Sequence, residues 1–96
     1  VVEALETVDN CAQQVVEAGL KQDYGFIIIA DHGNADFMIN ADGTPNTAHT
    51  TNPVPCFLLN TDFNTVKNGK LADIAPTVLK IMGVEIPEEM DGDVMV

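Results

Sequence analysis

Residues 25–36 of this chain read Gly-Phe-Ile-Ile-Ile-Ala-Asp-His-Gly-Asn-Ala-Asp, and this stretch decides the fold. Its first six residues are unbroken, apolar and rich in β-branched side chains, which is typical of a strand covered on both faces at the centre of an α/β sheet. A carboxylate and an imidazole, Asp31 and His32, follow directly. Because ligand sites of open α/β sheets lie at such strand ends, the stretch predicts an α/β fold with a mostly parallel central sheet and a polar site at its edge.

One helix is expected before this strand in the sequence and a second helix after it. Apolar positions spaced by three and four residues predict an amphipathic helix over residues 1–18, with Gly19 ending it in the left-handed conformation. A second helix is expected over residues 71–82, with Pro76 in its first turn, where a missing backbone N–H is tolerated. Gly83 is the natural end of that helix.

The chain between and after these helices predicts further extended segments. Residues 37–40 suggest a short strand, Asp42 and Gly43 a turn, and residues 44–51 a return from that turn. Residues 54–59 predict a second core strand. The remaining residues, 84–96, are expected to be extended and peripheral.

Composition excludes several classes of partner. The 96 residues include fifteen Asp and Glu but four Lys and no Arg, for a formal charge of −11, so the chain has no basic surface for nucleic acid or for an anionic membrane. The longest apolar run, residues 26–30, is too short to span a bilayer. Cys11 and Cys56 have no metal-type spacing and are expected to be reduced and buried.

Two absences point to a piece of a larger protein. The chain has no serine, and it has no arginine, so it cannot supply a serine nucleophile or a guanidinium fork for phosphate. It also starts at Val1, without Met, inside an apparent helical pattern. We therefore expect that groups needed for chemistry lie elsewhere in a parent chain.

Three residues are the candidates for chemistry, with Asp36 as a weaker fourth. Asp31 and His32 follow the first strand, and the excursion after it brings back a second imidazole, His49. Oxygen and nitrogen ligands without thiolate suit Mn²⁺, Mg²⁺ or Zn²⁺, and Gly33 allows a turn that points both neighbouring side chains to one region. The alternative is structural, because an Asp after a strand is commonly a cap and an isolated His is commonly a hydrogen-bonded bystander.

The residues around these candidates resemble a known family. Ile-Ala-Asp-His-Gly-Asn-Ala-Asp at 29–36, followed by Thr-Ala-His-Thr-Thr-Asn-Pro-Val-Pro at 47–55, is similar to the C-terminal metal motifs of the cofactor-independent phosphoglycerate mutases, in the alkaline phosphatase superfamily. Two stretches of the tail, 73–83 and 90–92, are similar too. The resemblance covers nearly the whole chain, and the pair of motifs at this separation is highly specific.

The resemblance implies a fold and an activity. Residues 1–96 would form the C-terminal part of a metal-binding, phosphatase-like domain, a partial three-layer αβα core. The parent would be a cytoplasmic isomerase of glycolysis and gluconeogenesis, which interconverts 3-phosphoglycerate and 2-phosphoglycerate through a phosphoserine at a two-metal site. The metal is usually Mn²⁺, two ions per full-length enzyme, with Mg²⁺, Co²⁺ or Zn²⁺ as alternatives.

The same resemblance implies roles for individual residues. Asp31 and His32 look like ligands of the metal that also contacts the nucleophilic serine, and His49 looks like a ligand of the other metal. Asp36 has no ligand role in that pattern, so we expect it in turn and surface chemistry. The family's remaining ligands, its nucleophile and its substrate-binding cations have no counterpart here, so no catalytic residue is expected in this chain, which should be inactive alone.

Two other functions remain open at this point. Phosphopentomutases and metal-dependent phosphatases share the superfamily chemistry, and the chain could instead be a non-catalytic acidic interaction module. We expect the full-length protein to be a monomer without nucleic-acid or membrane partners. The isolated piece is expected to self-associate through exposed sheet edges, which can pair with a second copy.

Overall fold

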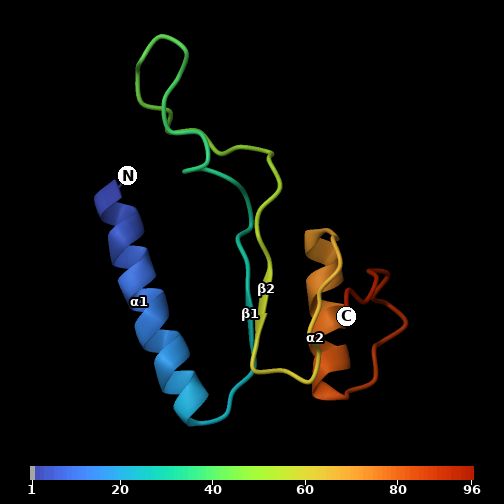
Figure 1. Cartoon of the computed structure of the whole chain (residues 1–96). Helices are drawn as coiled ribbons and strands as arrows, with labels where there is room; N and C mark the ends of the chain where they lie inside the picture. Colours follow the sequence, from blue (N-terminus) through green and yellow to red (C-terminus); the bar gives the residue numbers. More distant parts are fainter. Residues whose placement is uncertain (1) are drawn as a thin grey trace. The chain divides into compact units, whose positions relative to one another are not determined.

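The computed structural model describes residues 2–96, and these residues form an α/β structure (Figure 1). The chain divides into two compact units: the residues up to Tyr24 together with Ile29–Pro55, and Gly25–Ile28 together with Cys56–Val96. The elements, in chain order, are α1 (Val2–Lys21), β1 (Phe26–Ile28), β2 (Phe57–Leu59), the short 3-10 helix η1 (Leu71–Asp73) and α2 (Ile74–Met82).

Helix α1 confirms the first predicted helix but ends later than predicted. Gly19 is buried and still helical, so the expectation that it terminates the helix is wrong. The left-handed residue is instead Asp23, with φ of 60°, and Tyr24 N–H donates to Gly19 O at 2.9 Å to close the end. Asp is among the non-glycine residues that tolerate this conformation best. Val1, which the prediction placed in this helix, lies outside the described residues.

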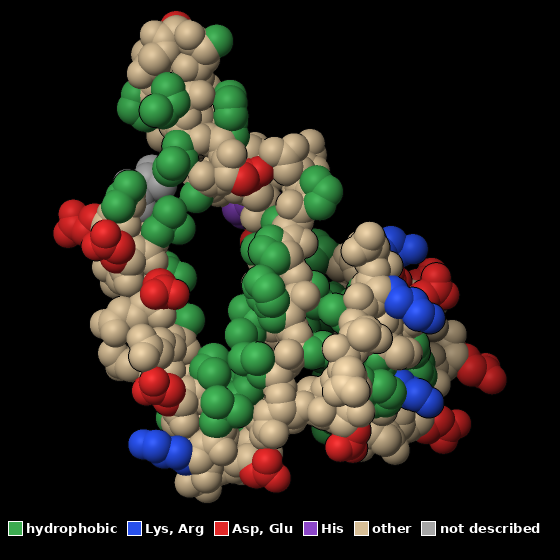
Figure 2. Space-filling model, in the orientation of Figure 1, with side chains coloured by type: hydrophobic (Ala, Val, Ile, Leu, Met, Phe, Trp, Pro, Cys, Tyr) green, Lys and Arg blue, Asp and Glu red, His purple; other side chains and the backbone are tan. Residues whose placement is uncertain are grey.

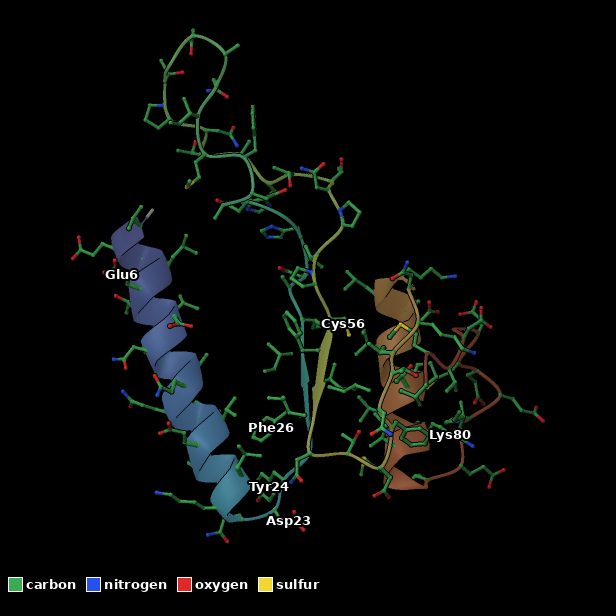
Figure 3. The ribbon with its side chains drawn as sticks, viewed as in Figure 1. Glu6, Asp23, Tyr24, Phe26, Cys56 and Lys80 are labelled. Atoms are coloured by element: carbon green, nitrogen blue, oxygen red, sulfur yellow. The ribbon has the colours of Figure 1, made fainter. Side chains whose placement is uncertain are left out.

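The apolar stripe of α1 is exposed within its unit. Val8 and Val15 each keep 64% of their surface exposed, and acidic residues such as Glu6 extend from the same helix (Figures 2 and 3). A helix with an apolar stripe normally buries that stripe against another element. The sequence pattern of α1 is therefore that of a covered helix, although the residues of its own unit leave it largely uncovered.

The two strands pair with each other in antiparallel orientation. Their register places Phe26 opposite Leu59 and Ile28 opposite Phe57. The sequence predicts a mostly parallel sheet, but the one strand pair among residues 2–96 is antiparallel. A parallel pair needs a crossover connection, usually a helix, whereas residues 29–56 contain no helix and instead turn back on themselves. Within its own unit, β1 is half-buried or exposed, so that unit does not cover both of its faces.

The excursion between the strands turns where predicted. Gly43 has φ of 86°, which glycine adopts without strain, and its N–H donates to Asn40 O at 2.9 Å. The returning chain meets the outgoing one at an isolated bridge between Ile39 and Pro45. Residues 37–40 form this single bridge and not the short strand expected from the sequence.

Helix α2 follows the prediction closely, with one turn of 3-10 helix, η1, before it. Pro76 is the third residue of α2 and is buried, in the first turn, where its missing N–H has no intrahelical partner to lose. Gly83 has φ of 72° and its N–H donates to Lys80 O at 3.1 Å. The predicted glycine end of this helix is confirmed.

The C-terminal segment is fastened to the start of α2, so the expectation that residues 84–96 are peripheral is wrong at their end. The carboxylate of Asp73 accepts the backbone N–H groups of Lys70 and Asp93, each at 2.9 Å. The buried hydroxyl of Thr77 donates to Asp73 O at 2.6 Å and accepts Met95 N–H at 3.0 Å. We call Asp73, Thr77, Asp93 and Met95 the C-terminal clip.

Packing agrees with these hydrogen bonds. Met95 is 4% exposed, and among residues 2–96 it forms the buried hydrophobic core. A Cβ on Gly69 would lie 2.5 Å from Met95 Sδ and 2.6 Å from an Asp73 carboxylate oxygen. The clip is therefore close-packed, and it orders a tail that has no regular secondary structure.

Both cysteines carry free thiols, as expected, but neither is buried. Cys11 is exposed on α1, and Cys56, which directly precedes β2 in Figure 3, is partly exposed. No helix among residues 2–96 combines the length and the hydrophobicity that crossing a membrane requires.

Replacing Thr77 with Val should destabilise the protein. The change keeps the shape of the side chain but leaves the buried N–H of Met95 without its acceptor, which costs about 1–3 kcal/mol. Urea unfolding followed by circular dichroism measures the difference. Thr65→Ala, at an exposed position, is the control and should change stability by less than about 0.5 kcal/mol. Equal stability of Thr77→Val and the wild type would contradict the clip.

The clip should also make stability depend on acid pH. The backbone N–H groups of Lys70 and Asp93 lower the pKa of Asp73 below its ordinary value of 3.8, against an opposing effect of desolvation. A depressed carboxylate pKa contributes stability above the ordinary value, and this contribution is lost as pH falls through the folded-state pKa. The urea midpoint of the wild type should therefore fall more steeply below about pH 4 than that of Asp73→Asn. Asp62→Asn controls for the loss of one charge, and parallel curves for Asp73→Asn and wild type would refute this role.

Candidate metal centre

The three candidate residues lie in the excursion that connects β1 with β2. Asp31 and His32 come three and four residues after the end of β1, and His49 lies on the returning chain. The Asp31 side chain is 81% exposed and that of His32 is 36% exposed. These groups are accessible to an ion or a ligand.

A pair of backbone hydrogen bonds brings the two histidines together. Gly33 N–H donates to Thr50 O at 3.2 Å, and Thr50 N–H donates to Gly33 O at 2.7 Å. His32 and His49 each precede one residue of this antiparallel bridge. Their rings stack with centroids 3.6 Å apart and an interplanar angle of 14°. The structure thus brings together two imidazoles that are seventeen positions apart in sequence.

The third candidate, Asp31, is adjacent to this stack. Its Oδ1 lies 3.5 Å from His32 Nε2, and His32 Nδ1 lies 3.0 Å from Gly33 O. A carbonyl oxygen can only accept, so this contact assigns the N–H of a neutral ring to Nδ1 and leaves a lone pair on Nε2. In that neutral tautomer, Nε2 and Asp31 Oδ1 are two acceptors facing one another, an arrangement that a bound cation, or a proton on Nε2, would stabilise.

The donor set fits a divalent ion. Ligand atoms bind Zn²⁺ and similar ions at about 2.0–2.2 Å, so two ligands of one ion lie about 3–3.5 Å apart. The separation of 3.5 Å between Asp31 Oδ1 and His32 Nε2 agrees with this value. A backbone carbonyl on the other ring nitrogen, here Gly33 O, is the usual orienting partner of a ligating histidine.

These residues do not complete a site by themselves. Among residues 2–96, no group of three or more His, Cys, Asp or Glu is arranged to hold a metal ion. Any ion bound here would need further donors from water, from substrate or from other polypeptide. Asp31, His32 and His49 are therefore candidate ligands and not a complete metal site.

Asp36 has a larger role than its sequence context indicates. Its carboxylate accepts the Thr50 hydroxyl at 3.0 Å from each oxygen and Asn52 Nδ2 at 2.7 Å. The hydrogen bond from Asn52 is the largest cause that lowers the pKa of Asp36 below 3.8, and the hydroxyl of Thr50 adds to it, against an opposing effect of desolvation. We expected Asp36 to serve only in turn and surface chemistry, and that expectation missed these contacts. Their one signal in the sequence is a pair of polar residues, Thr50 and Asn52, that follow His49.

Gly33 is required by this arrangement. A Cβ built on Gly33 would overlap Thr50 Oγ1 and would lie 2.8 Å from Asp36 Oδ1. Any side chain at this position would therefore displace the hydroxyl that links the two segments. Gly33 was expected to allow a turn, but the close approach of Thr50 is the stronger reason for glycine here.

A comparison with protein families gives one match over most of the chain. The family model described as the Metalloenzyme superfamily matches residues 1–86.

Curated relatives carry a common name. The chain is 54% identical over 94 residues to a 2,3-bisphosphoglycerate-independent phosphoglycerate mutase of Bacteroides thetaiotaomicron, covering 97% of this chain and 19% of the relative. The protein of that name from Flavobacterium johnsoniae is 54% identical over 89 residues, covering 93% of this chain and 18% of the relative. That of Salinibacter ruber is 53% identical over 96 residues, covering 99% and 18%. The chain thus spans less than a fifth of the length of these relatives.

Replacing Gly33 with Ala should separate the stacked imidazoles, because the new methyl group occupies the place of the Thr50 hydroxyl. NMR of histidine ring protons measures this: cross-ring nuclear Overhauser effects between His32 and His49 should be present in the wild type and lost in the variant. Gly43→Ala is the control, since a Cβ there meets open space and only the positive φ is strained. Cross-ring effects that persist in Gly33→Ala would refute the packing argument.

Proposed function

Because the chain belongs to the Metalloenzyme superfamily, we propose that it is a C-terminal piece of a 2,3-bisphosphoglycerate-independent phosphoglycerate mutase. The whole protein would be an isomerase that interconverts 3-phosphoglycerate and 2-phosphoglycerate through a phosphoserine at a two-metal site. The observation that carries this proposal is the convergence of His32, His49 and Asp31 in a chain 50–54% identical to curated enzymes of that name.

Asp31 and His32 would bind one metal ion, and His49 would bind the second. The contact between His32 Nδ1 and Gly33 O supports this assignment, since it directs the free lone pair of Nε2 toward the side of Asp31. Two divalent ions, when bound, supply the positive charge that offsets a phosphate dianion and stabilises the phosphoryl group in transfer. We propose Mn²⁺ as the natural ion, with Mg²⁺, Co²⁺ or Zn²⁺ as alternatives that oxygen and nitrogen ligands also accept.

The composition of the chain limits what it can do in this reaction. With a formal charge of −11, no Arg and no Ser, it can neither hold the substrate's phosphate by a guanidinium group nor form a phosphoserine. Its residues orient and hold the ions, and the nucleophile and the substrate-binding cations would come from the rest of the whole protein. The chain alone should be inactive.

The finer features of the fold belong to the same proposal. We propose that the whole protein completes a three-layer αβα core with a mostly parallel sheet, to which residues 1–96 contribute the C-terminal part. The exposed apolar stripe of α1 and the half-exposed strands support this, because such faces are normally covered. The whole protein would be a cytoplasmic monomer, and the isolated chain would self-associate through its strand edges.

Substitution of the proposed ligands tests this function in the full-length protein. Asp31→Asn, His32→Ala and His49→Ala should each lower kcat at least about 100-fold in a coupled mutase assay. Each change removes a proposed metal ligand, and even the loss of a residue that only hydrogen-bonds to a metal ligand lowers metal affinity or activity about 10- to 100-fold. Bound manganese, measured by mass spectrometry of the purified protein, should fall in parallel.

Two controls make the assay decisive. Glu6→Gln, at an exposed position on α1, should keep wild-type turnover, and the 96-residue chain alone should show none. Wild-type turnover in all three ligand variants would exclude the proposed roles, and robust mutase activity of the chain alone would show that the essential groups are already present in it.

A further inference from the structure

The contacts of Asp36 join residues that are far apart along the chain. Its partners Thr50 and Asn52 are fourteen and sixteen residues away. Asp42, by contrast, accepts the backbone N–H and the hydroxyl of Thr44, two residues on, in an ordinary local turn. Asp36 therefore joins two segments of the excursion, whereas Asp42 only shapes one turn.

The two segments joined by Asp36 are those that carry the histidines. Thr50 follows His49 directly and is already paired with Gly33 through two backbone hydrogen bonds. Asp36 adds a second attachment through the Thr50 hydroxyl and a third through Asn52. A single bridge would leave the returning segment free to rotate about it, whereas attachments at separate points along both segments oppose that rotation.

From this geometry we propose that Asp36 is a positioning residue of the metal centre: its carboxylate holds the 50–52 segment so that His49 stays beside His32 before any ion binds. This inference rests on the proposed function for its link to metal, but the contact between the rings is independent of it. Asp36 binds no ion itself. It acts through Thr50 and Asn52, whose neutral side chains donate hydrogen bonds to its carboxylate.

The inference makes the acceptor character of Asp36 essential. Asp36→Ala removes both carboxylate oxygens, so the Thr50 hydroxyl and Asn52 Nδ2 lose the group that accepts from them. Ordering of the site then has to occur when the ion binds, at a cost in affinity. Outer partners of metal ligands typically contribute 10–100-fold to affinity.

Titration of the metal-free full-length protein with Mn²⁺, followed by electron paramagnetic resonance, tests the inference. Asp36→Ala should bind Mn²⁺ about 10- to 100-fold more weakly than the wild type. At saturating Mn²⁺ its kcat should return to the wild-type value with unchanged KM, because Asp36 does not touch substrate. Asp36→Glu, which keeps a carboxylate, should recover part of the lost affinity. Asp42→Ala is the matched control and should bind Mn²⁺ as the wild type does.

The outcomes separate this inference from the proposed function. If the wild type binds Mn²⁺ and Asp36→Ala binds it equally well, the positioning role is wrong while the mutase proposal stands. A loss of activity that saturating Mn²⁺ does not restore would also overturn it, since that result indicates general damage to the fold. If the wild type binds no Mn²⁺, the mutase proposal fails, and the cross-ring nuclear Overhauser effects between His32 and His49 then decide. They should weaken in Asp36→Ala, and their persistence would refute the inference.

Discussion

The reciprocal pair of backbone hydrogen bonds between Gly33 and Thr50 is the constraint on which the candidate centre depends. An imidazole precedes each of these two residues, so closing the bridge also sets the distance between the rings. The bridge in turn depends on the missing side chain of Gly33, because a Cβ there would occupy the place of the Thr50 hydroxyl. The absence of a side chain on Gly33 thus permits both the backbone pairing with Thr50 and the contacts of Thr50 with Asp36.

Features of the fold that depend on local backbone chemistry could be predicted from the sequence. Pro76 in the first turn of α2, the left-handed Gly83 after it and the turn at Gly43 follow from the conformations open to these residues alone. The end of α1 shows the limit of such reasoning, because Gly19 could end the helix but is buried within it, and Asp23 takes the left-handed conformation instead. Strand orientation, cysteine burial and the attachment of the tail depend on partners distant in sequence, which one-dimensional patterns do not specify.

In the candidate site, too, some residues could be predicted from the sequence and some contacts could not. Asp31 and His32 could be identified because an apolar strand ends abruptly at them, and His49 because a turn returns the chain toward them. The contacts of Asp36 could not, since an Asp in a Gly- and Asn-rich turn has the sequence context of a local cap. Only the register of the returning segment, fixed by the bridge at Thr50, decides which polar side chains come within reach of its carboxylate.

The aspartates that hold this chain together accept from neutral donors and not from cations. Asp36 is held by a hydroxyl and an amide, and Asp73 chiefly by two backbone N–H groups, which is consistent with a chain that has fifteen acidic residues and only four lysines. Such donors stabilise a carboxylate without neutralising its charge. The excess negative charge therefore persists around the candidate centre, where it favours binding of divalent cations and opposes direct approach of an anionic substrate. A phosphate ester can react at such a surface only when bound cations, or basic groups outside these residues, reverse the local sign of the potential.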